Sequence, residues 1–417
     1  MKNKRKLFLT LVFAIPLVII FSQCLTNNEE KADPRGELYA GSASCIKCHK
    51  NVYDSYVHTA HFTTTRPADI HSINGNFNNN SNSYYFNKDL KVVMEKRNKG
   101  LYQVAYQKGK VIEAERFDIA FGGVKAETYL YWKGNKVHQL PMSYFSALHG
   151  WTNSPGYDGD HADFSRMIGK RCFECHSSYI KNLPLQTQSL QAIEEFDKKS
   201  LIFGIDCERC HGPAANHVNY HSDYPDEKKA KYIATYASLT RSQKIDMCAT
   251  CHSGNTTRML KSIFSFKPGD NLGDFKEIVF SHQNIDSAKL DVHGNQSQLL
   301  ASSKCFIMSK MDCATCHNVH KNEKQNLVLY SQKCTSCHNT PNHNECKMTP
   351  SIGGIIKNNC IDCHMPAKPS NAIAVQTAEK GKVVPYLVRT HHIAIYNKVS
   401  ITVINNLKKY NLLQADK

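Results

Sequence analysis

The first 23 residues divide into a basic stretch and an apolar stretch. Four basic residues within positions 2–6 precede an apolar run over residues 7–21. A membrane-spanning helix needs about 20 predominantly apolar residues, and this run is shorter. A basic start followed by a short apolar run is typical of a cleaved export signal. We therefore expect residues 1–23 to be an export signal and residues 24–40 to form a polar tether.

An alternating pattern typical of β-strands follows a polar loop. Residues 74–83, NGNFNNNSNS, indicate an exposed loop. Residues 101–106 and 111–117 are rich in strand-forming side chains, and Lys108-Gly109 between them offers a turn. The pattern predicts a small β-rich insertion. Two later stretches have apolar residues at helical spacing and predict amphipathic packing segments. Their apolar residues are Leu190, Ile193 and Phe196, and Tyr232, Ile233 and Tyr236.

Seven copies of Cys-x-x-Cys-His run along the chain, called motifs 1 to 7 in chain order. This spacing is the attachment signature of covalently bound haem c, in which two thiols hold the porphyrin and the histidine binds iron. Zinc or dithiol redox sites at all seven places are the alternative, and the number of copies makes it remote. The cysteines are Cys45, Cys48, Cys172, Cys175, Cys207, Cys210, Cys248, Cys251, Cys313, Cys316, Cys334, Cys337, Cys360 and Cys363. The proximal iron ligands are His49, His176, His211, His252, His317, His338 and His364.

The motifs are unevenly spaced. One motif precedes residue 170, and the other six lie between Cys172 and His364. We expect residues 41–170 to form an N-terminal region with one haem and the β-rich insertion, residues 171–370 a six-haem region in which the haems supply much of the buried apolar surface, and residues 371–417 a C-terminal segment. The predicted fold class is mainly α with much irregular structure, organised around stacked haems.

Three of the 17 cysteines lie outside the motifs. Cys24 follows the signal in a lipobox-like sequence, although Gln23 stands where a small residue is usual, so Cys24 is a candidate lipidation site. Cys305 and Cys346 are either bridged in an oxidising compartment or two unpaired thiols. None of the three indicates catalysis.

The formal charge of +16 does not indicate a nucleic-acid partner. Each haem carries two propionates, so seven haems bring the holoprotein close to neutrality. Much of the lysine and arginine excess is then explained by pairing with propionates. Because no basic stripe is interleaved with aromatic residues, we exclude nucleic-acid binding.

The 21 histidines supply 14 beyond the proximal ligands, twice the number needed for the opposite faces of seven haems. His320 follows His317 too closely to reach the far face of the same haem, so it is expected on a neighbouring iron. His217 lies beyond a Gly-Pro turn and suits the same role. His61 is a third candidate distal ligand, with His58 as its rival. The remaining candidates are His149, His293 and His392. A surface or propionate-contacting histidine is the alternative for each.

The chain resembles the cytochrome c552/c554 group of multihaem cytochromes, relatives of hydroxylamine oxidoreductase and cytochrome c nitrite reductase. The resemblance covers roughly residues 40–396 and rests on GSASCIKCHKNVYDSYVHTAHF, GIDCERCHGPAANHV, SKMDCATCHNVH, CIDCHMP and RTHHIAIY. It implies mostly helical haem regions, closely packed haem pairs, and distal ligands at His61, His217, His320 and one of His391 and His392. The chain lacks the Cys-x-x-Cys-Lys motif that marks the catalytic haem of the pentahaem nitrite reductases.

These features predict an exported seven-haem electron carrier with mainly bis-histidine irons. Its expected partners are redox proteins or a quinol-oxidising membrane complex. Its expected location is the periplasm, or the outer membrane of a Gram-negative bacterium through a lipid anchor. The alternative is a reductase or oxidase of small nitrogen or sulfur compounds with one open iron. In that enzyme a cavity residue would donate protons or hold an anion. The candidates are His138, His149, His161 and Arg166.

Overall fold

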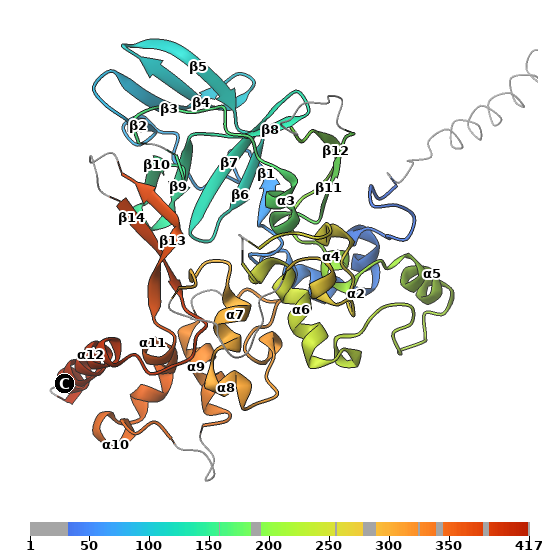
Figure 1. Ribbon diagram of the computed structural model, residues 1–417, viewed down its shortest axis with the longest axis vertical. Helices are drawn as coiled ribbons and strands as arrows, with labels where there is room; N and C mark the ends of the chain where they lie inside the picture. The colour runs from blue at the N-terminus through green and yellow to red at the C-terminus, as the bar shows by residue number, and fades with distance from the viewer. Residues whose placement is uncertain are drawn as a thin grey trace, which may run out of the picture.

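The computed structural model describes residues 32–157, 159–184, 193–254, 257–277, 289–323, 326–338, 345–377 and 383–415. The expected export signal and Cys24 lie outside these residues. Strands gather in one part of the molecule and short helices in the other (Figure 1). Within the described ranges, no helix has both the length and the apolar character needed to span a bilayer.

The helices are mostly short. They are α2 (Ser42–Tyr56), α3 (Lys170–His176), α4 (Cys207–His211), α5 (Ala215–Asp223), α6 (Arg241–His252), α7 (Gln296–Ala301), α8 (Lys304–Ile307), α9 (Leu327–Thr335), α10 (Thr349–Ile352), α11 (Cys360–His364) and α12 (Asn397–Ala415). The 3-10 helices are η1 (Ser146–Leu148), η2 (Tyr236–Ser238), η3 (Ile263–Ser265), η4 (Leu272–Asp274), η5 (Cys313–Thr315) and η6 (Gly354–Asn358).

The strands form two larger sheets and two hairpins. They are β1 (Thr65–Pro67), β2 (Ser83–Tyr85), β3 (Leu90–Arg97), β4 (Gly100–Gln107), β5 (Lys110–Arg116), β6 (Ile119–Gly122), β7 (Ala126–Lys133), β8 (Lys136–Gln139), β9 (Met142–Phe145), β10 (Gly150–Asn153), β11 (Tyr179–Asn182), β12 (Phe196–Ile202), β13 (Ala367–Gln376) and β14 (Val383–Arg389). One antiparallel sheet has the order β1-β6-β7-β9-β10 with β8 paired to β7, and the other has the order β2-β3-β4-β5.

The predicted hairpin is the β4–β5 pair. Lys108 and Gly109 connect the strands with φ values of 48° and 77°. Positive φ at both central residues is typical of the type I′ turn, whose twist matches that of the flanking strands. In β3 every second side chain is buried, from Leu90 through Val92 to Met94. The sheet therefore turns one face toward a core.

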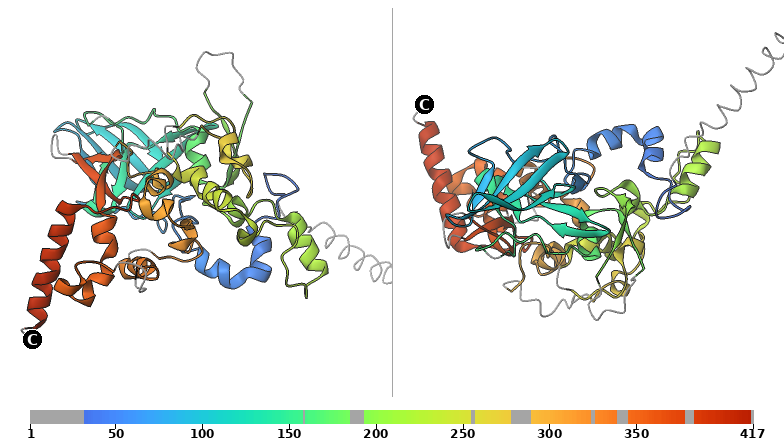
Figure 2. Two further views of the ribbon diagram at one scale, coloured as in Figure 1. Left: turned by 60° about the horizontal axis from the view of Figure 1, so that its bottom comes forward. Right: turned by 90° about the horizontal axis from the view of Figure 1, so that it is seen from above.

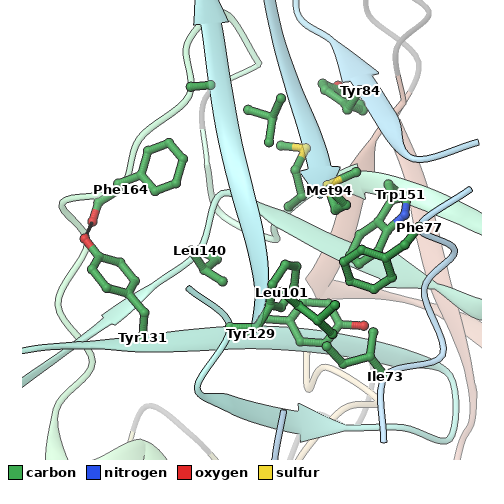
Figure 3. Close-up of a cluster of buried hydrophobic side chains, with 14 of the residues drawn as sticks. Ile73, Phe77, Tyr84, Met94, Leu101, Tyr129, Tyr131, Leu140, Trp151 and Phe164 are labelled. Atoms are coloured by element: carbon green, nitrogen blue, oxygen red, sulfur yellow. Dashed lines mark hydrogen bonds between the residues drawn. The ribbon is translucent and has the colours of Figure 1, made fainter. Parts of the chain in front are cut away.

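Aromatic side chains fill the core between the two larger sheets (Figure 3). The Phe117 ring packs edge-on against Tyr129, with ring centres 4.9 Å apart, and Trp151 contacts both. Trp151 Nε1 donates a hydrogen bond to the Asn76 carbonyl oxygen at 2.8 Å. Gly75 lies against the indole so closely that an added Cβ would come within 2.1 Å of it. This packing anchors the polar loop of residues 74–83 to the sheet.

A second apolar cluster joins the larger sheet to motif 2. Phe173 of α3 is fully buried, and its ring packs against Phe121 of β6 at 5.3 Å and Phe196 of β12 at 5.5 Å. The position of α3, which carries motif 2, is therefore set by the β part of the molecule. The hairpin β13–β14 returns to the same part, where Tyr386 packs on Phe145 with ring centres 5.7 Å apart. Figure 2 shows α12 and α5 at opposite ends of the molecule.

The structure differs from the sequence predictions in two respects. The mainly-α class underestimates the β structure, because the strands between motifs 1 and 2 form two sheets rather than a small insertion. The two stretches with helical spacing are not helices where they are described: Phe196 begins strand β12, and Tyr236 lies in the short η2. Phe196 pairs with Asn182 of β11, a contact that local spacing cannot indicate. Leu190 lies outside the described residues.

Candidate haem-binding site

All seven motifs line one cavity of about 4000 Å³. Divided among seven motifs, this volume is roughly 570 Å³ each, within the range of pockets that hold one organic ligand. Both cysteines and the histidine of every motif belong to the lining. The cavity is therefore large enough for a series of cofactors.

Short helices orient the cysteines and histidine of a motif toward the same side. In α4, Cys207, Cys210 and His211 are the first, fourth and fifth residues. Residues three and four apart lie on one face of a helix, so both thiols and the imidazole project together. The Asp206 side chain caps α4 by accepting a hydrogen bond from the Arg209 amide at 2.8 Å. Local sequence thus fixes the attachment geometry.

Four proximal histidines each face a second imidazole ring at nearly the same separation. The ring centres are 6.4 Å apart for His49 and His217, 6.2 Å for His252 and His61, 6.0 Å for His211 and His320, and 6.2 Å for His317 and His391. An iron about 2 Å from one nitrogen of each imidazole, with each ring centre roughly 1 Å beyond its nitrogen, requires a separation of about 6 Å. The four pairs therefore fit six-coordinate haem iron.

Burial disfavours the charged form of several cavity histidines. Burial, followed by the charges of neighbouring histidines, lowers the pKa of His61, His176 and His391 to about 4 each. Burial also lowers the pKa of His320. A neutral imidazole has the free lone pair that iron needs.

Several ring nitrogens are held by the surrounding chain. His217 Nδ1 lies 2.8 Å from the Lys231 carbonyl oxygen, and His364 Nδ1 lies 3.0 Å from that of Ala394. The Thr64 hydroxyl lies 3.0 Å from His176 Nδ1. When the other ring nitrogen binds iron, Nδ1 carries the proton and donates these bonds, which fixes the ring orientation.

Motifs far apart in sequence abut through their cysteines. Four pairs of cysteine side chains from different motifs lie in contact: Cys45 and Cys207, Cys175 and Cys251, Cys248 and Cys313, and Cys334 and Cys360. Cys210 of motif 3 lies within electrostatic range of Cys251, and Cys316 of motif 5 within that of Cys334. All seven motifs are thereby connected, and motif 4 touches the neighbourhoods of motifs 2, 3 and 5.

The structure places the other candidate ligands differently. His391 faces His317, whereas the adjacent His392 contacts Tyr396 and does not line the cavity. His149 lies at the end of η1, exposed and outside the cavity lining. His293 does line the cavity, and burial lowers its pKa.

Among the described residues, His176 of motif 2 and His364 of motif 7 have no stacked histidine ring, although His293 lies within electrostatic range of His176. The His176 ring instead stacks on Phe121, with ring centres 4.9 Å apart and planes 13° apart. The Thr65 hydroxyl donates a hydrogen bond to the His176 carbonyl oxygen. Residues of β1 and β6 therefore hold the proximal side of motif 2.

The proposed proton donors and anion clamp are divided between cavity and surface. Arg166 lines the cavity and donates a hydrogen bond to the Pro155 carbonyl oxygen at 2.9 Å. His138 packs against Tyr131, and His161 is exposed beside Asp160; neither belongs to the cavity lining. Cys305 and Cys346 are free thiols, so the structure does not contain a disulfide between them.

Sequence reasoning missed three residues around the motifs. Thr64 and Phe121 hold His176, and Lys276 is buried within electrostatic range of Cys175 and Cys251. Thr64 lies three residues after His61, so the sequence could have predicted that Thr64 lies near an iron ligand. Phe121 and Lys276 carry no local signal, because they reach the site only through sheet pairing and loop packing.

Comparison with known proteins agrees with this geometry. Residues 131–212, which contain motifs 2 and 3, match the family model described as cytochrome c554 and c-prime. A solved structure, that of the outer cell wall cytochrome OcwA, shares the fold with a TM-score of 0.53 and 16% sequence identity, covering 88% of this chain and 81% of that one. None of the curated protein sequences matches the chain. The family match over residues 131–212 and the shared fold are similarities to c-type cytochromes, and they support haem attachment at the Cys-x-x-Cys-His motifs.

Proposed function

We propose that the protein is an exported electron carrier with seven haems c, most of them ligated by two histidines. The four facing histidine pairs carry this proposal. An iron with two axial imidazoles has no vacant position for a substrate, so it accepts and passes electrons only. Two histidine ligands also favour ferric iron more than a histidine–methionine pair does, which suits low-potential partners.

The contacts between motifs support a continuous electron route. Sulfur contacts link motif 1 to motif 3, motif 4 to motifs 2 and 5, and motif 6 to motif 7. Electrostatic contacts link motif 3 to motif 4 and motif 5 to motif 6. Porphyrins attached at adjoining sulfurs lie close to one another. Motifs 1 and 7 are then the two ends of the longest route.

Partners and location follow from the same reasoning. An export signal at residues 1–23 supports the periplasm, and lipidation of Cys24 would fix the protein to the outer membrane of a Gram-negative cell. A relative of the same fold is described as an outer cell wall cytochrome. Electrons would come from redox proteins or a quinol-oxidising membrane complex, and nucleic acid plays no part.

Haem content and electron flow test this function. The intact mass of the purified holoprotein should correspond to seven covalent haems. In a stopped-flow experiment, a soluble ferric acceptor should oxidise the dithionite-reduced protein completely. A fraction of haem that stays reduced would contradict a connected route.

A second function, reduction or oxidation of a small nitrogen or sulfur compound, is favoured by one observation at motif 2. The His176 ring stacks on Phe121 and on no histidine ring in the described residues, with His293 within electrostatic range, while Arg166 and Arg171 line the same cavity. An open iron beside arginines could hold a small anion. Nitrite or hydroxylamine should then shift the visible spectrum of one haem, and an unchanged spectrum would exclude this function.

A further inference from the structure

Motif 4 occupies the junction of the cavity. Its helix α6 packs against α3 of motif 2, against η5 of motif 5 and against α7. His252 lies within electrostatic range of five other cavity histidines. These are His61, His176, His293, His317 and His391. Electrons entering at motifs 2 or 3 pass motif 4 before they reach motif 5.

The ligand rings at motif 4 are arranged differently from those at the other described pairs. The planes of His252 and His61 are 86° apart. The corresponding angles are 15° for His49 and His217, 9° for His211 and His320, and 28° for His317 and His391. Motif 4 thus has perpendicular ligands, whereas the other three pairs are close to parallel.

Ring orientation affects iron through its π-type d orbitals. Parallel rings both overlap the same d orbital and raise its energy, which stabilises the electron hole of ferric iron. Perpendicular rings act on two different orbitals and leave them nearly equal in energy, so ferric iron gains less. All else being equal, the iron with perpendicular ligands is therefore the easier one to reduce.

Buried cations around motif 4 act in the same direction. Lys276 is fully buried, and its Nζ donates a weak hydrogen bond to the Gly254 carbonyl oxygen at 3.3 Å. Cys175 and Cys251 lie within its electrostatic range, as do Arg171 and Glu174. Arg171 and Glu174 largely cancel each other as an ion pair of 3.7 Å. The positive charge of Lys276 has no such partner among these groups, so it would act on the nearby haems.

Arg209 adds a second cation at motif 4. Its charge acts on Cys251, and its Nη2 donates to the Glu174 carbonyl oxygen at 3.1 Å. Arg209 Nε is buried without a hydrogen-bond partner in the described structure, so its charge is incompletely solvated. Reduction removes one positive charge from the iron, and a buried cation nearby makes that change more favourable.

We infer that the haem of motif 4, held between His252 and His61, is the electron collection point of the protein: it lies at the branch of the route and is reduced before the other haems. This inference rests on the proposed electron-transfer function. His61, Lys276 and Arg209 act as positioning and charge-setting residues for this iron.

A redox titration of the full holoprotein, followed by low-temperature EPR, tests the inference. Nearly equal d orbitals give a low-spin signal whose largest g value is shifted to low field, so motif 4 should be distinguishable from the three parallel pairs. His61→Ala should convert this signal to a high-spin one, which assigns it. As the potential is lowered stepwise, this signal should disappear first.

Lys276 provides the matched comparison. Lys276→Met should move the loss of the low-field signal to lower potential while the other signals stay in place, whereas Lys276→Arg and the surface change Lys199→Met should leave it unmoved. Reduction of this haem after the others, or an unshifted signal in Lys276→Met, would overturn the inference. If Lys276→Met does not assemble, the order of reduction in the unaltered protein decides. If all seven haems are reduced but in another order, the inference about motif 4 fails and the electron-transfer function does not. If some haems cannot be reduced, the electron-transfer function itself is contradicted.

Discussion

The imidazole rings of His211 and His320 lie parallel within 9°, with their centres 6.0 Å apart. His211 belongs to motif 3, and His320 follows motif 5. In the proposed ligation, the second ligand of one iron therefore comes from the chain segment that attaches another haem, and His217, which follows motif 3 and faces His49 of motif 1, repeats the arrangement. Such an exchange of ligands would fix the separation of neighbouring haems.

Removal of His320 should open the iron of motif 3 alone. In His320→Ala the facing ring is lost, so we expect one low-spin haem to become high-spin and to bind added ligands. EPR and visible spectra of the ferric protein measure this change. His161→Ala removes an exposed histidine outside the cavity and is the matched control. An unchanged spectrum in His320→Ala would show that His320 is not an axial ligand.

A buried ion network attaches the chain before motif 1 to motif 3. Arg35 is nearly inaccessible and pairs with Asp33 at 2.8 Å, Asp206 at 2.7 Å and Glu208 at 3.1 Å. Glu208 also accepts hydrogen bonds from the backbone amides of Ala40, Gly41 and Ala214. The network therefore holds the start of α2 against α4.

Arg35→Met would leave the three carboxylates buried without their cation. Breaking such a pair costs about 3–5 kcal/mol, so we expect a loss of this size in the free energy of unfolding, measured by guanidinium titration. Arg97→Met, which breaks a more exposed pair with Glu95, should cost about 1 kcal/mol or less. Equal losses in the two variants would contradict a structural role for the Arg35 network.

The aromatic core of the β part has no room beside Trp151. Gly75→Ala places a methyl group within 2.1 Å of the indole, and such overpacking costs about 1–3 kcal/mol. The thermal midpoint of the variant should fall accordingly. Gly150→Ala is the control, because its added carbon meets only the Leu148 carbonyl oxygen at 3.5 Å. An unchanged midpoint in Gly75→Ala would mean that the loop of residues 74–83 is not anchored there.

The charge of Lys276 predicts a pH dependence at motif 4. Burial first, and then repulsion by Arg171, lower the pKa of Lys276 to about 8 from an ordinary 10.5. Below pH 8 the ammonium favours ferrous iron, and above pH 8 its loss favours ferric iron. The midpoint potential of the motif 4 haem should fall as pH rises from 7 to 9. In Lys276→Met this fall should be absent; its persistence would assign the effect to another group.

Most residues of the haem-binding site could be predicted from local sequence motifs. The residues that could not be predicted reach the site through contacts between distant parts of the chain. The haem-attachment cysteines and proximal histidines follow from spacing alone, the distance to a motif indicates His217 and His320, and the family resemblance implies His61. The choice of His392 over His391 depends on which ring the loop turns inward, and the loop is set by contacts with Ser303, whose hydroxyl accepts from the Ile393 amide. The larger sheet could not be read from local patterns alone, because the pairing of β1 with β6 joins residues far apart in sequence.

Low-temperature EPR of the oxidised holoprotein, recorded alone and with nitrite and hydroxylamine, tests the central claim most directly. Iron held between two histidines is low-spin and closed to added ligands, so the spectrum should be dominated by low-spin signals that neither compound alters. A high-spin signal that shifts with either compound would contradict a purely electron-carrying protein and would direct attention to the open face of motif 2.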